Sequence, residues 1–233
     1  DGISIEKNKK GNFVLGVHIA DVSYYVKENG AIDREAYARG TSVYLVDRVI
    51  PMLPRELSNG VCSLNPNEDR LAFSVLMEID ARGTVVNHTI EESVIRSSQR
   101  MVYEDVTRIL EKNDAELIER YSDYIDDLRN MEALAEILRN KRMRRGSIDF
   151  DLDETRITLD LKGRPIDVMP YERGISNRII EEFMLVCNET VAEFMTWNET
   201  PFVYRIHEEP EVEKLLEFNE FIHNFGYHLK GIG

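Results

Sequence analysis

The sequence predicts an α+β fold, in which groups of strands and groups of helices follow one another along the chain. Strand-like patterns dominate as far as about Ser98, and a helical period begins near Tyr103. A further pair of strand-like segments and two more helical segments come after it. This order of strands, helices, strands and helices is typical of the α+β class.

The first strong strand signal is GNFVLGVHIADVSYYV, residues 11–26. One face of this strand carries Phe13, Leu15, Val17 and Ile19, and the other carries Val14, Gly16, His18, Ala20 and Val22. A strand that is apolar on both faces is expected inside a sheet, covered on both sides. The next segment, AIDREAYARG, predicts a short helix that ends at Gly40.

The following segments predict one more strand, a hairpin and two helices. TSVYLVDRVIPMLP, residues 41–54, is strand-like and stops at prolines. Residues 70–80 and 84–98 flank a glycine turn and predict a β-hairpin. Helical periods follow in residues 103–112 and, more strongly, in 127–146, with Gly146 as the stop. The apolar stripe of the second helix consists of Leu128, Met131, Leu134 or Ala135, and Leu138.

The last third of the chain predicts a strand pair around Lys162-Gly163 and then two helices. The strongest helical pattern spans residues 176–197, with Ser176 as the expected N-cap. Residues 201–210 indicate a short strand or an extended segment, and residues 211–226 a final helix.

Composition narrows the class of protein. The chain is 42% hydrophobic and 31% charged, and it holds no apolar run long enough to span a bilayer, so we expect no membrane contact. The two cysteines have no metal-binding spacing and indicate a reducing, cytoplasmic location. A net charge of −14 weighs against a nucleic-acid partner, but it does not exclude one, because a groove can be basic locally and a metal site needs carboxylates.

Five strings, taken together and in order, resemble one protein family. They are GVHIADVSYYV, ARGTSVYLVDRVIPMLPRELSNGVCSLNPNEDRLAFSV, RRGSIDFDLDE, ISNRIIEEFMLVCNETVAEF and PFVYRIHEEP. They resemble the catalytic RNB domain of the ribonuclease II and ribonuclease R family, and the ribonuclease R branch more closely. The resemblance implies a central, mostly antiparallel sheet flanked by helices, and residues 1–233 as a single fragment of an RNB domain that is trimmed on both sides.

The same resemblance implies a function. Family members are magnesium-dependent 3′-to-5′ exoribonucleases, which hydrolyse single-stranded RNA processively to nucleoside 5′-monophosphates. The family's metal ligands are four clustered aspartates, of which Asp1 matches the last, with Gly2 where alanine is usual. Because one carboxylate does not hold Mg²⁺ tightly, we expect two metal ions in the parent protein and no nuclease activity in this fragment.

The strand GVHIADVSYYV contains the ionisable residues His18 and Asp21. In an extended strand their side chains point to opposite faces. They are therefore not a catalytic dyad. Asp21 either supports the metal site, as a candidate catalytic residue beside Asp1, or accepts hydrogen bonds from loop N–H groups. His18 is expected to be a hydrogen-bonded core histidine.

Four residues match family positions that contact RNA. Tyr44 and Phe150 match rings that clamp the terminal bases, and without the resemblance both would pass for core aromatics. Tyr103 and Glu181 match groups near the last ribose, where a phenol and a carboxylate can read the 2′-hydroxyl. Periodicity does not decide whether Glu181 or the adjacent Glu182 faces the site, although we expect Glu182 to be a solvated helix charge.

The densest basic patch is NKRMRRG, residues 140–146, which includes Arg144 and Arg145. These cations either complement the dipole at a helix C-terminus or track the phosphates of RNA, and the pattern favours neither. The expected partner is single-stranded RNA, and no protein partner is inferred. The rival hypothesis is an RNA-binding relative without catalysis, which three further aspartates upstream of Asp1 would exclude.

Overall fold

The computed structural model describes residues 1–148, 154–171 and 173–231. The chain divides into two compact units, Asp1–Phe194 and Met195–Gly233, each of which is described by itself. The expectation that residues 1–233 belong to a single RNB domain stays a prediction.

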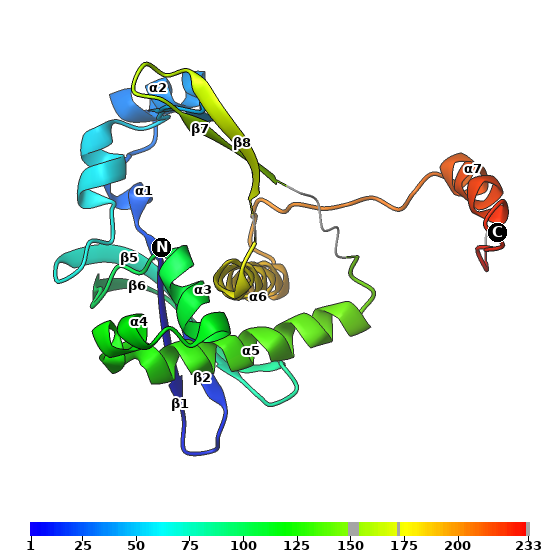
Figure 1. Ribbon diagram of the computed structural model, residues 1–233, viewed down its shortest axis with the longest axis horizontal. Helices are drawn as coiled ribbons and strands as arrows, with labels where there is room; N and C mark the ends of the chain where they lie inside the picture. Colours follow the sequence, from blue (N-terminus) through cyan, green and yellow to red (C-terminus); the bar gives the residue numbers. More distant parts are fainter. Residues whose placement is uncertain (149–153, 172, 232–233) are drawn as a thin grey trace. The chain divides into compact units, whose positions relative to one another are not determined.

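The first unit is built around a four-stranded antiparallel sheet (Figure 1). Its order is β1 (Gly2–Lys7), β2 (Phe13–Ala20), β5 (Asp69–Ile79) and β6 (Val85–Arg96). The interior place of β2 agrees with its two apolar faces, and the β5–β6 pair confirms the predicted hairpin. Together with the helices, the sheet confirms the α+β class.

The strand prediction for residues 11–26 is wrong beyond Ala20. Residues Val22–Tyr25 form the one-turn helix α1 instead. The cause is Asp21, whose carboxylate accepts hydrogen bonds from the Tyr24 backbone N–H at 3.0 Å and from the Ser23 hydroxyl at 2.6 Å. An N-cap of this kind ends the strand and starts a helical turn, whatever the apolar pattern suggests.

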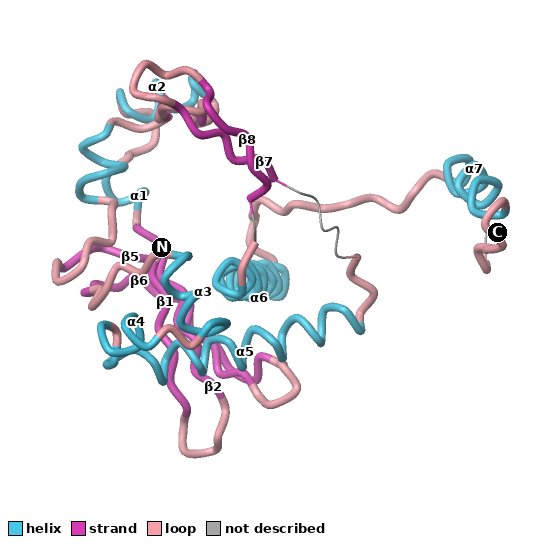
Figure 2. Tube along the Cα trace, viewed as in Figure 1, coloured by secondary structure: helices cyan, strands magenta, loops and turns pink. Residues whose placement is uncertain are grey.

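The main core lies between the sheet and two long helices, α5 (Ile125–Arg144) and α6 (Ile175–Trp197) (Figure 2). The sheet contributes Ile5, Phe13, Leu15, Val17, Val75, Met77 and Ile79, and the helices contribute Leu134, Ala135, Leu138, Ile179, Phe183, Val186 and Cys187. This confirms the predicted stripe of α5, and Gly146 ends the helical segment with a φ of 99°, a conformation that suits glycine.

A second, smaller core joins α3 (Tyr103–Lys112), α4 (Ala115–Arg120) and the turn Ser122–Tyr124 to the start of α5. Its buried members are Val106, Ile109, Leu117, Tyr121, Ile125 and Leu128. This cluster sets the position of the first turn of α3, which borders the site described below.

Four shorter elements and a hairpin complete the first unit. They are α2 (Ala31–Arg39), β3 (Val43–Tyr44), β4 (Val49–Ile50), the helical turn Glu56–Val61, and the hairpin of β7 (Glu154–Leu159) and β8 (Pro165–Tyr171). Gly40 ends α2 as predicted. The long strand expected over residues 41–54 is reduced to the two-residue ladder of β3 and β4.

The second unit contains the end of α6 and helix α7 (Val212–His223), which confirms the predicted final helix. Residues 201–210 form neither helix nor strand. Ser176 is not the N-cap of α6 but its second residue, and it is buried. Within the described residues, no helix is both long and apolar enough to cross a bilayer.

The two cysteines differ in their surroundings. Cys187 is buried in the main core, and burial raises the pKa of its thiol to about 11. Cys62 is partly exposed, and burial together with the nearby Asp21 carboxylate raises its pKa as well. Cys187 is therefore a core thiol and Cys62 is not, and neither environment favours a reactive thiolate.

Candidate functional site

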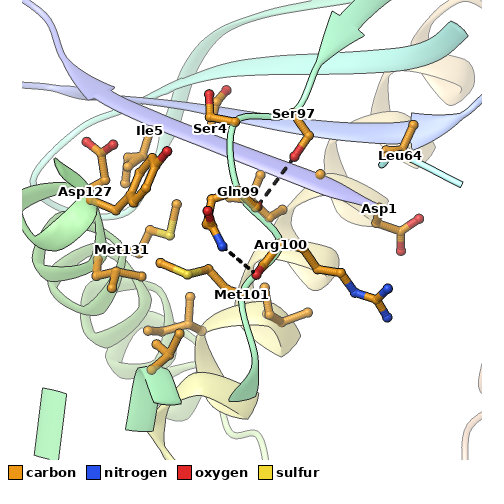
Figure 3. Close-up of a pocket in the computed structure, with 18 of the residues that line it drawn as sticks. Asp1, Ser4, Ile5, Leu64, Ser97, Gln99, Arg100, Met101, Asp127 and Met131 are labelled. Carbon is orange, nitrogen blue, oxygen red and sulfur yellow. Dashed lines mark hydrogen bonds between the residues drawn. The ribbon is translucent and has the colours of Figure 1, made fainter. Parts of the chain in front are cut away.

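A cavity of about 560 Å³ opens at the start of β1 (Figure 3). Its walls are the first residues of β1, the segment Ser97–Val102 that joins β6 to α3, the first turn of α3, and side chains of α5 and α6. This volume lies within the roughly 300–1,000 Å³ of typical ligand sites. The cavity has an apolar part, around Met101, Met131 and Ile179, and a polar part with Asp1, Ser97, Gln99 and Arg100.

Asp1 and Tyr103 line this cavity together, although a hundred residues of sequence separate them. Tyr103 is the first residue of α3, and 45% of its surface is exposed. Its backbone oxygen accepts a hydrogen bond from the Ser176 hydroxyl at 3.0 Å, and that hydroxyl also pairs with the Thr107 hydroxyl at 2.7 Å. The first turn of α3 is therefore tied to α6, which explains why Ser176 is buried rather than capping its own helix.

The structure separates the two adjacent glutamates. Glu181 is partly exposed and accepts a hydrogen bond from Arg173, and it does not line the cavity, although the preceding Ile180 does. Glu182 is only 3% exposed, so the expectation that it is a solvated charge is wrong. The reason is helical phase, because Glu182 lies on the buried side of α6 together with Phe183.

Arg142 of α5 neutralises the buried Glu182. Its Nη2 lies 2.6 Å from Oε1, and its Nε lies 3.2 Å from Oε2, so both carboxylate oxygens are engaged. The remaining Nη1 donates to the Ser147 hydroxyl at 2.6 Å. This pair fixes α5 against α6 and leaves Glu181, which is paired with Arg173, as the more exposed of the two glutamates.

His18 also borders the cavity, and both of its ring nitrogens are hydrogen-bonded. Nε2 lies 3.0 Å from the Ser4 hydroxyl, and Nδ1 lies 2.6 Å from the Ser74 hydroxyl, which continues to Ser93 at 2.6 Å. Burial lowers the pKa of His18 and favours the neutral imidazole. The expected hydrogen bonding of His18 is confirmed, but the residue is partly buried at the cavity wall rather than in the core.

The other predicted residues do not meet in this cavity. Asp21 caps α1 and does not line the cavity, which favours its structural interpretation. Tyr44 lies on β3 with 78% of its surface exposed, and it does not line the cavity either. Phe150 lies outside the described residues. Arg144 is exposed in the last turn of α5, and Arg145 forms an exposed ion pair with Glu189 at 2.6 Å.

Acidic ligands for a metal ion are sparse here. Among residues 1–148, 154–171 and 173–231, no group of three or more His, Cys, Asp or Glu side chains is placed to hold a metal ion. Asp1 and Asp127 are the acidic residues that line the cavity. The described residues therefore do not by themselves form a two-magnesium centre, which needs several oxygen ligands.

The sequence pattern does not identify the segment Ser97–Val102 as part of a site, because it assigns Ser97 and Ser98 to the hairpin strand and the next four residues to no element. The structure shows β6 ending at Arg96, and the next six residues form one wall of the cavity. The run RSSQR, residues 96–100, was the available signal, since a polar stretch there interrupts the strand period.

Known proteins resemble this chain over nearly its whole length. The Ribonuclease R of Thermotoga maritima is 50% identical over 231 residues, which is 99% of this chain and 32% of that protein. The apo form of Mycoplasma genitalium RNase R matches with a TM-score of 0.88 and 32% identity, over 99% of this chain and 36% of that one.

The M. genitalium enzyme in complex with ribose-methylated single-stranded RNA matches with a TM-score of 0.86 and 33% identity, over 96% of this chain and 34% of that one. The chain thus spans about a third of the length of these relatives. A family model described as RNB domain matches residues 1–231. The chain therefore belongs to the RNB domain family, as its five sequence strings indicated.

Proposed function

We propose that the full-length protein is a 3′-to-5′ exoribonuclease of the ribonuclease R type, which degrades single-stranded RNA processively to nucleoside 5′-monophosphates. The observation that carries the proposal is the RNB match over residues 1–231, within which Asp1 and Tyr103 line one cavity. Half of the aligned residues are identical to a protein named Ribonuclease R. The reduced cysteines fit a cytoplasmic location.

The proposed RNA-binding residues fall into two groups, one that contacts the sugar and one that contacts the bases. The Tyr103 phenol and the Glu181 carboxylate read the 2′-hydroxyl of the last ribose, since a phenol can donate and a carboxylate can accept. The tie between Tyr103 and Ser176 supports this role, because it holds the phenol's helix against α6. Tyr44 and Phe150 stack on the terminal bases, and the high exposure of the Tyr44 ring supports its share of this role.

The proposed metal is Mg²⁺, and a nuclease family is consistent with a divalent ion. In such enzymes two metal ions activate the attacking water and stabilise the leaving oxygen. Asp1 is the ligand we propose from this chain. A single carboxylate does not complete the metal site. The proposed reaction therefore needs further metal ligands besides the residues that the structure describes.

The test uses full-length protein and single-stranded RNA labelled at its 5′ end, with Mg²⁺ present. We expect progressive shortening from the 3′ end and release of nucleoside 5′-monophosphates, and we expect Asp1→Asn to abolish release while RNA binding persists. Binding of RNA by the wild-type protein without any release would contradict the proposal and favour the rival, a non-catalytic RNA-binding relative.

A further inference from the structure

The charged residues that line the cavity are Asp1, Arg96, Arg100 and Asp127. The Arg96 guanidinium is engaged, because its Nε lies 2.7 Å from the Asp69 carboxylate. The Arg100 guanidinium forms no hydrogen bond or ion pair within the part of the chain that the structure describes. Arg100 is therefore the cavity's uncommitted cation among these four residues.

The backbone around Arg100 is held in place on both sides. Before it, the Ser97 backbone oxygen accepts from the Asn67 N–H at 2.7 Å. At Arg100 itself, the Gln99 side chain donates to the backbone oxygen at 3.1 Å. After it, Tyr103 is tied to Ser176 of α6. Arg100 thus extends from a fixed segment, which reduces the entropy lost when its side chain binds a ligand.

The direction of the side chain agrees with a binding role. Figure 3 shows the Arg100 guanidinium directed toward the same end of the cavity as Asp1, and away from the end with Met131 and Asp127. Tyr103, the proposed reader of the ribose, lies three residues further along the chain and lines the same cavity. A cation and a carboxylate thereby lie at one end of a cavity that the Tyr103 residue also lines.

An anionic ligand needs the Arg100 cation, because the chain and half of the charged residues in the cavity are acidic. The chain carries a net charge of −14, and two of the cavity's four charged residues are carboxylates. A phosphate entering such a cavity is repelled unless a cation offsets the carboxylates. Arg96 is neutralised by Asp69, which leaves Arg100, whose planar guanidinium can bind two phosphate oxygens at once.

We propose that Arg100 binds a backbone phosphate of single-stranded RNA at the mouth of the cavity, beside the ribose that Tyr103 contacts. This inference rests on the proposed function and adds a residue to it. In this role Arg100 positions the strand and raises its affinity without reading the base, because phosphates carry no sequence information.

The experiment compares three variants of the full-length protein, Arg100→Gln, Arg100→Lys and the matched control Arg96→Gln. Binding of a labelled single-stranded RNA oligonucleotide is measured over a salt series, with EDTA present to prevent degradation. Arg100→Gln should bind about tenfold more weakly, which is the order expected for losing a hydrogen bond to a charged group. It should also reduce the slope of log affinity against log salt by about 0.7, the value for one phosphate contact on a single strand.

The other variants separate charge from geometry. Arg100→Lys should keep the salt slope and recover only part of the affinity, because an ammonium group cannot pair with two phosphate oxygens in one plane. Arg96→Gln should lower the slope and the affinity less than Arg100→Gln does, because its guanidinium is already paired with Asp69. Thermal unfolding of each variant, with unchanged midpoints, confirms that the differences arise in binding.

Two failures can be told apart. If wild-type protein binds the RNA and Arg100→Gln has the same slope and affinity, Arg100 is a solvated surface arginine and the inference is wrong. If the wild-type protein does not bind single-stranded RNA at all, the proposed function falls, and this inference falls with it.

Discussion

Gly16 shows how a single residue without a side chain shapes the site. A Cβ at this position would collide with the Ser4 hydroxyl and lie 2.7 Å from Nε2 of His18. Real Cβ atoms do not approach polar atoms so closely, so one of the two partners would have to move. The hydrogen bond between Ser4 and His18 at the cavity wall therefore requires glycine at position 16 of β2, opposite Ser4 and two residues before His18.

Gly16→Ala should lower the free energy of unfolding by about 1–3 kcal/mol, as overpacked interiors do. The matched control is Gly2→Ala in the neighbouring strand, where the new methyl group would meet its nearest atom at an ordinary 3.5 Å. Urea denaturation of the two variants measures the difference. Equal stability of both variants would show that Ser4 and His18 adapt without cost.

The second prediction about single residues concerns Tyr103 and Glu181. Tyr103→Phe or Glu181→Ala should narrow the preference of the full-length protein for RNA over DNA, since each change removes a group that can bond the 2′-hydroxyl. Competition between labelled RNA and DNA strands of one sequence measures this preference. Unchanged discrimination in both variants would remove these residues from the proposed sugar site.

At the scale of elements, two ion pairs join α5 to α6, and their surroundings differ. The Arg142–Glu182 pair has side chains that are 20% and 4% exposed, whereas the Arg145–Glu189 pair has side chains that are 61% and 54% exposed. When a buried pair loses one partner, the other charge stays uncompensated where water reaches it poorly. When an exposed pair loses one partner, water solvates the remaining charge.

Glu182→Ala should therefore destabilise the fold by about 3 kcal/mol, at the low end for breaking a buried pair because Arg142 retains some access to water. Glu189→Ala, one ion pair away on the same two helices, should cost about 0–1 kcal/mol. Chemical denaturation of both variants compares them directly. Similar losses for the two would mean that burial does not decide the strength of this contact.

At the scale of the whole molecule, the acidic balance and the sparse metal ligands bear on what this chain can do alone. Its net charge is −14, and the described residues hold no cluster of three or more potential metal ligands. Two magnesium ions need several carboxylates, because each ion retains an octahedral shell of oxygens. Asp1 alone does not meet that requirement.

The purified 233-residue chain should therefore fold and yet release no nucleotide from labelled single-stranded RNA with Mg²⁺ or Mn²⁺. Cooperative thermal unfolding, followed by circular dichroism, controls for folding, and the full-length protein controls for the assay. Processive release of monophosphates by the short chain would mean that a residue with a structural assignment here, Asp21 first, binds the metal.

Local pattern was enough for the elements whose period is long and uninterrupted. The strand Phe13–Ala20, the hairpin of β5 and β6, and helices α5, α6 and α7 were all predicted. These follow from alternation, helical spacing and glycine stops, which act within a few residues of one another. The pattern failed at Val22–Tyr25, where a side-chain cap outweighs it.

The amino-acid pattern and its family resemblance were thus enough for the class of fold, the family and the residue types available for RNA. Which of these residues meet depends on packing: Glu182 is buried against Arg142 while Glu181 stays partly exposed, Ser176 is bound to the start of α3, and Asp1, Tyr103 and Arg100 line one cavity. The physical reason is that periodicity gives the direction of a side chain within its own element. Its partners, burial and pKa come from elements that are distant in sequence and adjacent only after folding.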